Sequence, residues 1–155
     1  MRSRSDGAPT APGWRRGLED WSPLVLYTAL IVTLSSIPTL APPTGGLVTD
    51  KAYHLVEYAG WALLFRRALD RGRPVTSWRW LKTLVTVILG ACLAVADENF
   101  QRTVGRQYAL ADMAADVLGV VLAQPVYEFL SARVRTARRL AMQRTPDDSG
   151  EISTS

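Results

Sequence analysis

The chain has very few of the residues that build disulfides and metal centres. It contains one cysteine, Cys92, and one histidine, His54, among 155 residues. A single cysteine excludes a disulfide within the chain and a cysteine-based metal site, so we expect Cys92 to be a small buried apolar residue. A lone histidine also fails to provide the ligand set of a common zinc site. We therefore predict neither a metal nor another cofactor.

Catalytic and nucleic-acid motifs are also missing. The sequence shows no glycine-rich loop for phosphate, no readable Ser-His-Asp arrangement, no nucleic-acid motif and no internal repeat. Lysine is scarce, with only Lys51 and Lys82, so the positive charge is almost entirely arginine. A basic balance fits nucleic acid or anionic lipid, and the clustering of arginine at the ends of apolar runs favours lipid. We predict membrane lipids as a partner, and no nucleic acid.

Charge is absent from one long stretch near the N-terminus. Residues 21–48 carry none, and residues 24–40 suit a first membrane helix. A cleaved signal peptide is the alternative, but the preceding region is long and contains Glu19 and Asp20, and Pro42 follows the only plausible cleavage point. We expect residues 1–19 to form a mobile basic tail, and the prolines and glycines of residues 38–46 to form a turn.

Three further apolar segments follow, predicted as helices over residues 50–69, 77–96 and 109–130. The third has a short uncharged centre and crosses a membrane only if Arg79 and Lys82 extend to one interface. The fourth carries Asp112, Asp116 and Pro125, and a soluble amphipathic helix is its alternative. Residues 133–144 hold five arginines, which predicts contact with an anionic inner leaflet, and residues 145–155 are expected to be disordered.

The basic residues predict an orientation. Of the 18 Lys and Arg residues, fifteen fall in the N-terminal tail, around the loop between the second and third segments, or in the C-terminal stretch. Because basic residues are enriched on the cytoplasmic side, both termini should be cytoplasmic. The predicted fold is all-α, an integral bundle of four transmembrane helices in the plasma membrane. Residues 1–19 are its tail, 20–131 its membrane domain, and 132–155 a basic juxtamembrane segment with a disordered tail.

Ionisable side chains gather at the predicted outer ends of these helices. At 100° per residue, Asp50, His54 and Glu57 fall within about 60° of one another on the second helix, with Tyr58 beside them. Charges in membrane segments persist when they pair or line a polar cavity, and they are candidates for function. One face of this helix is therefore predicted to be polar.

The fourth segment repeats the spacing of the second. Asp112 and Asp116 stand four residues apart, as Asp50 and His54 do, and both helices are predicted to run inward from outside. We therefore expect His54 and Asp116 to lie at one depth, within hydrogen-bond reach. Gly119 should let a neighbouring helix approach closely. An ionised Asp116 would favour the charged form of His54.

These residues, with those at the end of the third segment, form a predicted outward-facing polar cup. A structural network that locks short helices together is the alternative, and a calcium or magnesium ion bound among the carboxylates is another. The predicted cup consists of Asp50, Lys51, His54, Tyr58, Asp97, Glu98, Gln101, Arg106, Asp112 and Asp116.

Three short motifs within the cup occur in order over residues 21–130. They are Asp50-Lys51 with His54 and Tyr58; Asp97-Glu98 with Gln101; and Arg106 with Asp112, Asp116 and Gly119. Together they resemble the VanZ-like family of small membrane proteins. The family usually has Asn where this chain has Asp116. The resemblance implies an envelope membrane protein, and the family's namesake raises tolerance of glycopeptide antibiotics such as teicoplanin.

The leading functional hypothesis is a non-enzymatic envelope protein whose cup binds or masks a cell-wall precursor, a lipid-linked ligand or a glycopeptide. The alternative is a membrane enzyme acting on a lipid-linked envelope substrate. In that case His54 would be the acid or base, Asp50 or Asp116 would orient it, and Lys51 or Arg106 would hold an anionic headgroup. A small oligomeric proton-coupled transporter is a third hypothesis.

Overall fold

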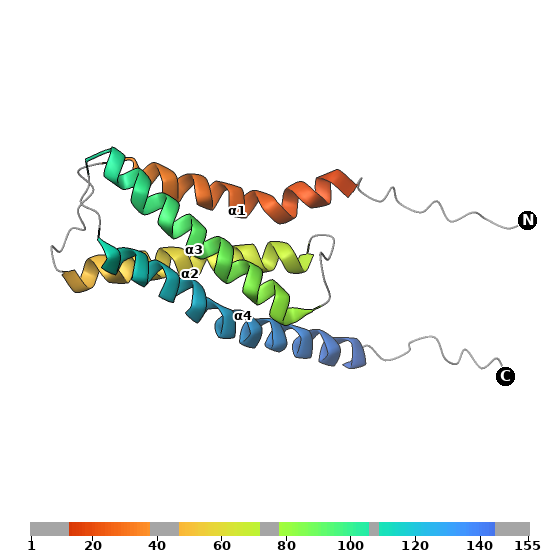
Figure 1. The fold of residues 1–155 in the computed structure, drawn as a ribbon. Helices are drawn as coiled ribbons and strands as arrows, with labels where there is room; N and C mark the ends of the chain where they lie inside the picture. The colour runs from red at the N-terminus through yellow and green to blue at the C-terminus, as the bar shows by residue number, and fades with distance from the viewer. Residues whose placement is uncertain (1–12, 38–46, 72–77, 106–108, 145–155) are drawn as a thin grey trace, which may run out of the picture. The chain divides into compact units, whose positions relative to one another are not determined.

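The structure, a computed structural model, describes residues 13–37, 47–71, 78–105 and 109–144 (Figure 1). This part of the chain holds four α-helices and no strand, which confirms the all-α prediction for the residues described. The helices are α1 (Gly13–Ser35), α2 (Leu47–Arg71), α3 (Arg79–Thr103) and α4 (Leu110–Arg144). The chain divides into two units between Gln124 and Pro125, inside α4.

The helices are longer than the apolar runs that predicted them. Helix α1 begins at Gly13, within the stretch assigned to a tail, and α3 continues past residue 96 to Thr103. Helix α4 also continues beyond residue 130 to Arg144. Residues 126–144 contain neither glycine nor proline and are rich in alanine, leucine and arginine. These are strong helix formers, so nothing in the local sequence ends the helix there.

Aromatic packing joins α1 to α2 in the core of the first unit. The rings of Trp61 and Phe65 are stacked with centroids 5.0 Å apart, and Trp21 of α1 meets Phe65 edge-on. The Trp61 indole donates to the hydroxyl of Thr28 at 3.0 Å. Buried indole N–H groups usually need such a partner, so this bond fixes how α1 lies against α2.

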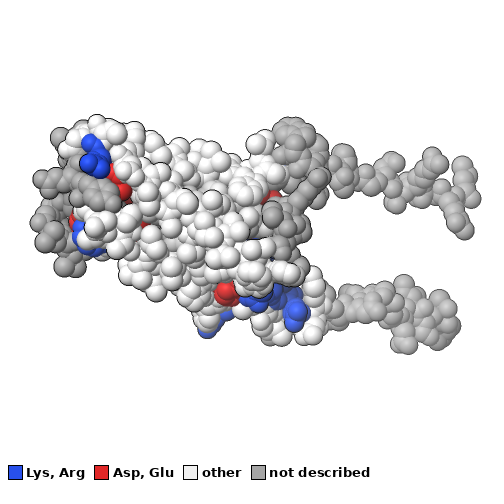
Figure 2. Space-filling model, in the orientation of Figure 1, with Lys and Arg blue, Asp and Glu red and all other residues white. Residues whose placement is uncertain are grey.

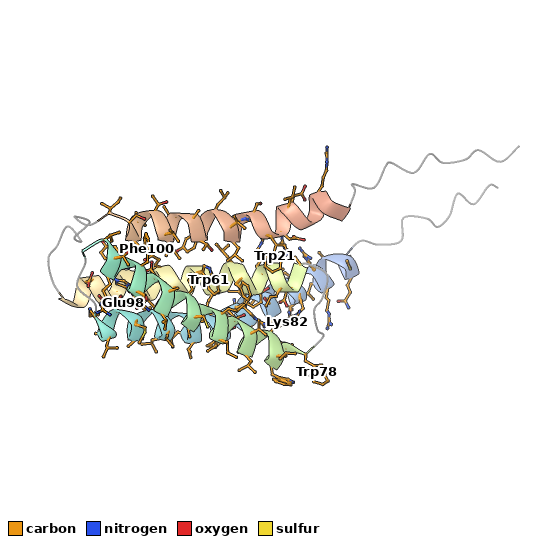
Figure 3. The ribbon with its side chains drawn as sticks, turned by 45° about the horizontal axis from the view of Figure 1, so that its top comes forward. Trp21, Trp61, Trp78, Lys82, Glu98 and Phe100 are labelled. Carbon is orange, nitrogen blue, oxygen red and sulfur yellow. The ribbon has the colours of Figure 1, made fainter. Side chains whose placement is uncertain are left out.

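The antiparallel order of α1, α2 and α3 follows from contacts at one end. The Arg67 guanidinium of α2 donates to the backbone carbonyl of Asp20 near the start of α1, at 3.4 Å. Lys82, near the start of α3, binds Asp70, near the end of α2, at 2.6 Å. In Figure 3, Lys82 lies toward one end of α3 and Glu98 toward the other. The predicted cup residues therefore belong to the opposite end of the unit.

Helices α2 and α4 approach each other closely at Gly119. A Cβ atom there would collide with the carbonyl oxygen of Leu55 and lie 3.1 Å from the backbone nitrogen of Ala59. The predicted close approach at Gly119 is confirmed. Similarly, a Cβ on Gly90 of α3 would lie 2.7 Å from a methyl group of Val120. Small residues thus bring α4 against both α2 and α3.

Two of the described helices, α3 and most of α4, are long and apolar enough to cross a membrane. Helix α3 exposes Leu84, Ile88 and Val95, and the atoms over its middle are uncharged in Figure 2. Cys92 is also exposed on α3, so the expectation that it is buried was wrong. Its neighbours on this helix are apolar and outward-facing, so an apolar residue type did not imply burial.

Candidate polar site at the helix ends

The first turns of α2 and α4 lie side by side and run in the same direction. Asp50, Lys51 and His54 come from α2, and Asp112 and Asp116 come from α4. Because each set is spaced by a helical turn, side chains at matching depths face each other across the close contact at Gly119. This end of the unit therefore concentrates charge between two backbones that are nearly in contact.

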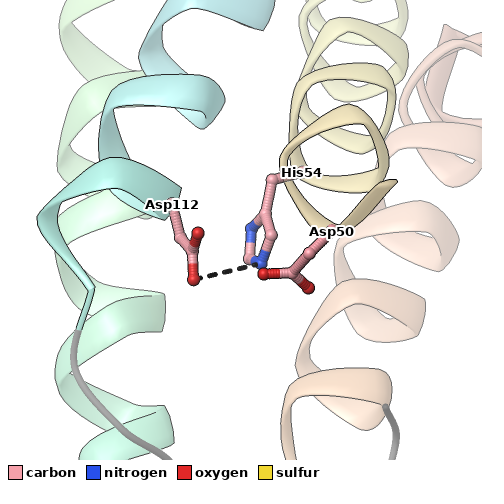
Figure 4. A group of neighbouring side chains, drawn as sticks. All are labelled: Asp50, His54 and Asp112. Atoms are coloured by element: carbon pink, nitrogen blue, oxygen red, sulfur yellow. Dashed lines mark ion pairs between the residues drawn. The ribbon is translucent and has the colours of Figure 1, made fainter. Parts of the chain in front are cut away.

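His54 lies between two carboxylates. Its Nδ1 atom is 3.0 Å from Oδ1 of Asp116, which confirms the predicted contact. Its Nε2 atom is 3.9 Å from Oδ2 of Asp112 (Figure 4). The exposed fraction is 7% for His54 and 1% for Asp116. An ionised Asp116 could only accept a hydrogen bond, so in that state Nδ1 would carry the proton, while Nε2 faces Asp112.

Lys51 joins the two outermost carboxylates. Its ammonium binds Asp112 and lies 3.5 Å from Oδ2 of Asp50. The side chains of Lys51 and Asp50 are each 29% exposed, whereas that of Asp112 is 12% exposed. This part of the site therefore opens to the surroundings at Asp50 and Lys51 and becomes buried toward Asp116.

The same side chains offer ligands for a cation. One atom each from Asp50, His54 and Asp112 lies within 4.8 Å of the others (Figure 4). Zinc–ligand bonds of about 2.0–2.2 Å would require these atoms to draw closer together. The Lys51 ammonium already lies within ion-pair distance of both aspartates. A metal ion would therefore have to compete with the Lys51 ammonium for these two carboxylates.

The predicted cup residues of α3 have a different role. Asp97 accepts a hydrogen bond from Gln101 at 2.8 Å, and Gln101 also reaches the hydroxyl of Ser35 in α1 at 3.3 Å. Glu98 accepts a hydrogen bond from the backbone N–H of Ala109, the residue preceding α4, at 2.6 Å. These contacts tie the end of α3 to α1 and to the beginning of α4.

Ser35 was not among the predicted site residues. It is buried at the end of an apolar run, and only its pairing with Gln101 reveals a role. A serine that ends a membrane-like segment gives no sequence signal of its own. The missing information was which face of α1 packs against the end of α3.

Tyr58 is the aromatic residue of the predicted cup. It is fully buried, and its hydroxyl has no hydrogen-bond partner among the residues described. Arg106, another predicted cup residue, falls outside the described residues.

The site has an acidic balance. Five described carboxylates contribute, and Lys51 and His54 are the cationic or potentially cationic side chains placed among them. An acidic, partly exposed site favours ligands that carry positive charge or several hydrogen-bond donors. The buried histidine–carboxylate contact would also suit proton transfer.

Comparison of the chain with protein-family models, with curated proteins and with solved structures finds no match in any of the three.

Proposed function

We propose that this chain is a VanZ-like integral protein of the plasma membrane, with four membrane-spanning helices and both termini in the cytoplasm. Its polar cup would face outside and bind or mask an envelope ligand, either a cell-wall precursor or a glycopeptide of the teicoplanin type. The resemblance of three ordered motifs and the arginine distribution support this proposal. The contacts at the cup provide the physical argument.

The observation that carries the proposal is the set of contacts between the first turns of α2 and α4. His54 binds Asp116, and Lys51 binds Asp112, at the end of the unit where α3 also places two buried carboxylates. Fixing so many charges between helices is costly unless they are paired. The partial exposure of Asp50 and Lys51 gives an incoming ligand access to this prearranged cluster.

The apolar surfaces support a membrane location. Helices α3 and α4 have the length and composition of membrane spans. Helix α2 carries more charge, but several of its polar side chains, including His54 and Arg66, are buried within the protein. Burial among neighbouring helices is the arrangement in which membrane segments retain ionisable residues.

A glycopeptide-susceptibility assay tests the proposal. Wild type and variants are expressed in a teicoplanin-sensitive bacterial host at matched membrane abundance. We expect wild type to raise tolerance, and Asp50→Asn, Lys51→Gln and Asp112→Asn each to reduce the effect in a graded manner. Asp70→Asn is the matched control, because this half-exposed carboxylate lies on α2 at the opposite end and binds Lys82. If expression of the wild-type protein leaves the teicoplanin susceptibility of the host unchanged, the glycopeptide role is refuted.

A direct binding measurement separates the ligands. Purified protein in lipid vesicles is titrated with teicoplanin and with a lipid-linked cell-wall precursor. The cup should bind one of them, and the same three substitutions should weaken that binding while Asp70→Asn leaves it unchanged. Loss of protein from the membrane in every cup variant would instead identify the cluster as a structural network.

The contact between His54 and Asp116 supports one second candidate, a membrane enzyme acting on a lipid-linked envelope substrate. Asp116 would orient the ring, leaving Nε2 to exchange a proton with substrate near Asp112. An enzyme should convert such a substrate in vesicles and lose nearly all turnover with His54→Ala while remaining folded. A binding protein should show no turnover and a partial loss of binding.

A further inference from the structure

The last part of α4 has an amphipathic surface that the cup does not use. This segment, residues 126–144, belongs to the second unit of the chain. Its large apolar side chains Phe129, Leu130, Val134 and Leu140 are all exposed. Their exposed fractions, from 50% to 57%, are well above those of buried core residues. Such a row of exposed apolar side chains indicates a surface that contacts another apolar phase.

These apolar residues share one side of the helix. At 100° per residue, they fall with Ala137 and Ala141 within an arc of about 140°. Arg135, Arg138 and Arg139 occupy an arc of about 100° on the opposite side. All three arginines are exposed. The segment therefore has a broad apolar face and a basic face, the pattern of helices that lie in a membrane interface.

Arg133 and Arg144 are exceptions, because both positions fall within the apolar arc. Arg144 is the last residue of the helix. The guanidinium of Arg133 does not remain there as an isolated charge, since its central carbon lies 4.7 Å from the centroid of the Phe129 ring. A guanidinium over an aromatic face is a favourable contact and leaves the charge near the edge of the apolar surface. Long basic side chains at a bilayer surface extend toward headgroups in a similar way.

The length of α4 requires part of it to lie outside a bilayer core. The helix has 35 residues, or about 52 Å at 1.5 Å per residue, whereas the hydrocarbon core is about 30 Å thick. The predicted inner end is also the arginine-rich end. Pro125, which stands at the boundary between the two units, removes one backbone hydrogen bond from the helix. A change of helix direction is easiest at such a residue.

We propose that residues 126–144 dock on the surface of an anionic lipid bilayer, with the apolar face in the headgroup–acyl boundary and the arginines among anionic headgroups. Charge complementarity selects this occupant. The segment contains five arginines and only one acidic residue, Glu128. A second copy of the same segment would bring like charges together. A nucleic acid would leave the exposed apolar face without a partner.

Spin-label accessibility in the full-length protein tests this proposal. Single cysteines replace Ala137, at the centre of the apolar arc, or Met142, on the opposite side, in a Cys92→Ala background. The protein is reconstituted in phosphatidylcholine vesicles with or without phosphatidylglycerol. With the anionic lipid, the label at Ala137→Cys should become accessible to oxygen and protected from a water-soluble nickel chelate. The label at Met142→Cys should remain accessible to the chelate.

Charge variants supply the matched comparison. Replacing Arg135, Arg138 and Arg139 together by glutamine should remove the dependence on anionic lipid, and replacement by lysine should retain it. Each lost charge should shift the equilibrium toward the undocked state by about fivefold, and high salt should act in the same direction. Equal chelate access at both positions in anionic vesicles would overturn the proposal. Magnetic coupling between labels on different copies would also overturn it, in favour of self-association.

Discussion

Asp116 and His54 form a buried contact between two helices, with 3.0 Å between Oδ1 and Nδ1. The carboxylate lies one helical turn below Asp112, which faces the other ring nitrogen at 3.9 Å. The ring is therefore oriented from one side while its second nitrogen faces the open part of the site. This relationship matters to both functional proposals, because it determines which histidine atom a ligand could meet.

Substitution of Asp116 tests how much of the contact depends on charge. Asp116→Asn keeps an oxygen that accepts the Nδ1 proton, so we expect the protein to fold with only a small loss of stability. Asp116→Ala leaves a buried donor without this partner and should cost about 1–3 kcal/mol in unfolding free energy. Denaturant unfolding in detergent measures both values. Of these two variants, only Asp116→Asn should retain the Nδ1-protonated form of His54, which nitrogen NMR would detect. Equal losses in the two variants would show that charge, rather than hydrogen bonding, maintains the contact.

Gly119 tests the close contact beneath this pair. The Cβ atom of Gly119→Ala would collide with the Leu55 backbone, which cannot move aside as a flexible side chain could. We expect a destabilisation of about 1–3 kcal/mol and a weakened contact between His54 and Asp116. Gly17→Ala is the matched control, since no atom lies within 4 Å of its added Cβ. It should stabilise α1 by about 0.5–1 kcal/mol. Unfolding measurements that rank the two variants in the opposite order would contradict the packing described.

The sequence predicted the contact between His54 and Asp116 because two periodicities agreed. Residues four apart on a helix lie one turn apart in depth, so two parallel helices with the same spacing place these residues at matching depths. Gly119 indicated which face of its helix a neighbouring helix could approach closely. The positions of Ser35 and Lys51 required different information. Which neighbour they reach depends on how the helices pack laterally, and helical spacing within one segment does not contain that information.

The end of α3 shows why charge alone was a poor guide to helix boundaries. The charges of Asp97 and Glu98 predict that the apolar segment ends near residue 96, yet the helix continues to Thr103. Both carboxylates are buried because Gln101 and the Ala109 backbone satisfy them. Partners supplied by the tertiary structure therefore allowed a polar turn to remain helical. Cys92 shows the reverse case, an apolar residue on an exposed face.

Glu98 is predicted to stabilise the beginning of α4. Its Oε1 atom accepts the Ala109 N–H at 2.6 Å, so Glu98→Ala removes the partner of a helix-terminal donor. A loss of about 0.5–2 kcal/mol is expected, with faster hydrogen exchange at the Ala109 amide. Glu98→Gln retains an oxygen acceptor and should change both quantities less. Asn99→Ala is the control, because that exposed side chain bonds only a carbonyl of its own helix among the contacts described. Equal exchange in all three variants would rule out the capping role.

Cysteine labelling in intact cells tests the orientation on which the outer cup depends. Trp78 and Thr103 are exposed residues at the two ends of α3, whose 25 residues are long enough to cross a membrane. In a Cys92→Ala background, an impermeant reagent should label Thr103→Cys from outside and reach Trp78→Cys only after the membrane is opened. The arginine asymmetry is the physical reason, since translocating basic loops is unfavourable. The opposite labelling would place the cup in the cytoplasm and exclude direct binding of external glycopeptide. Labelling of both positions in intact cells would show that α3 does not separate two compartments.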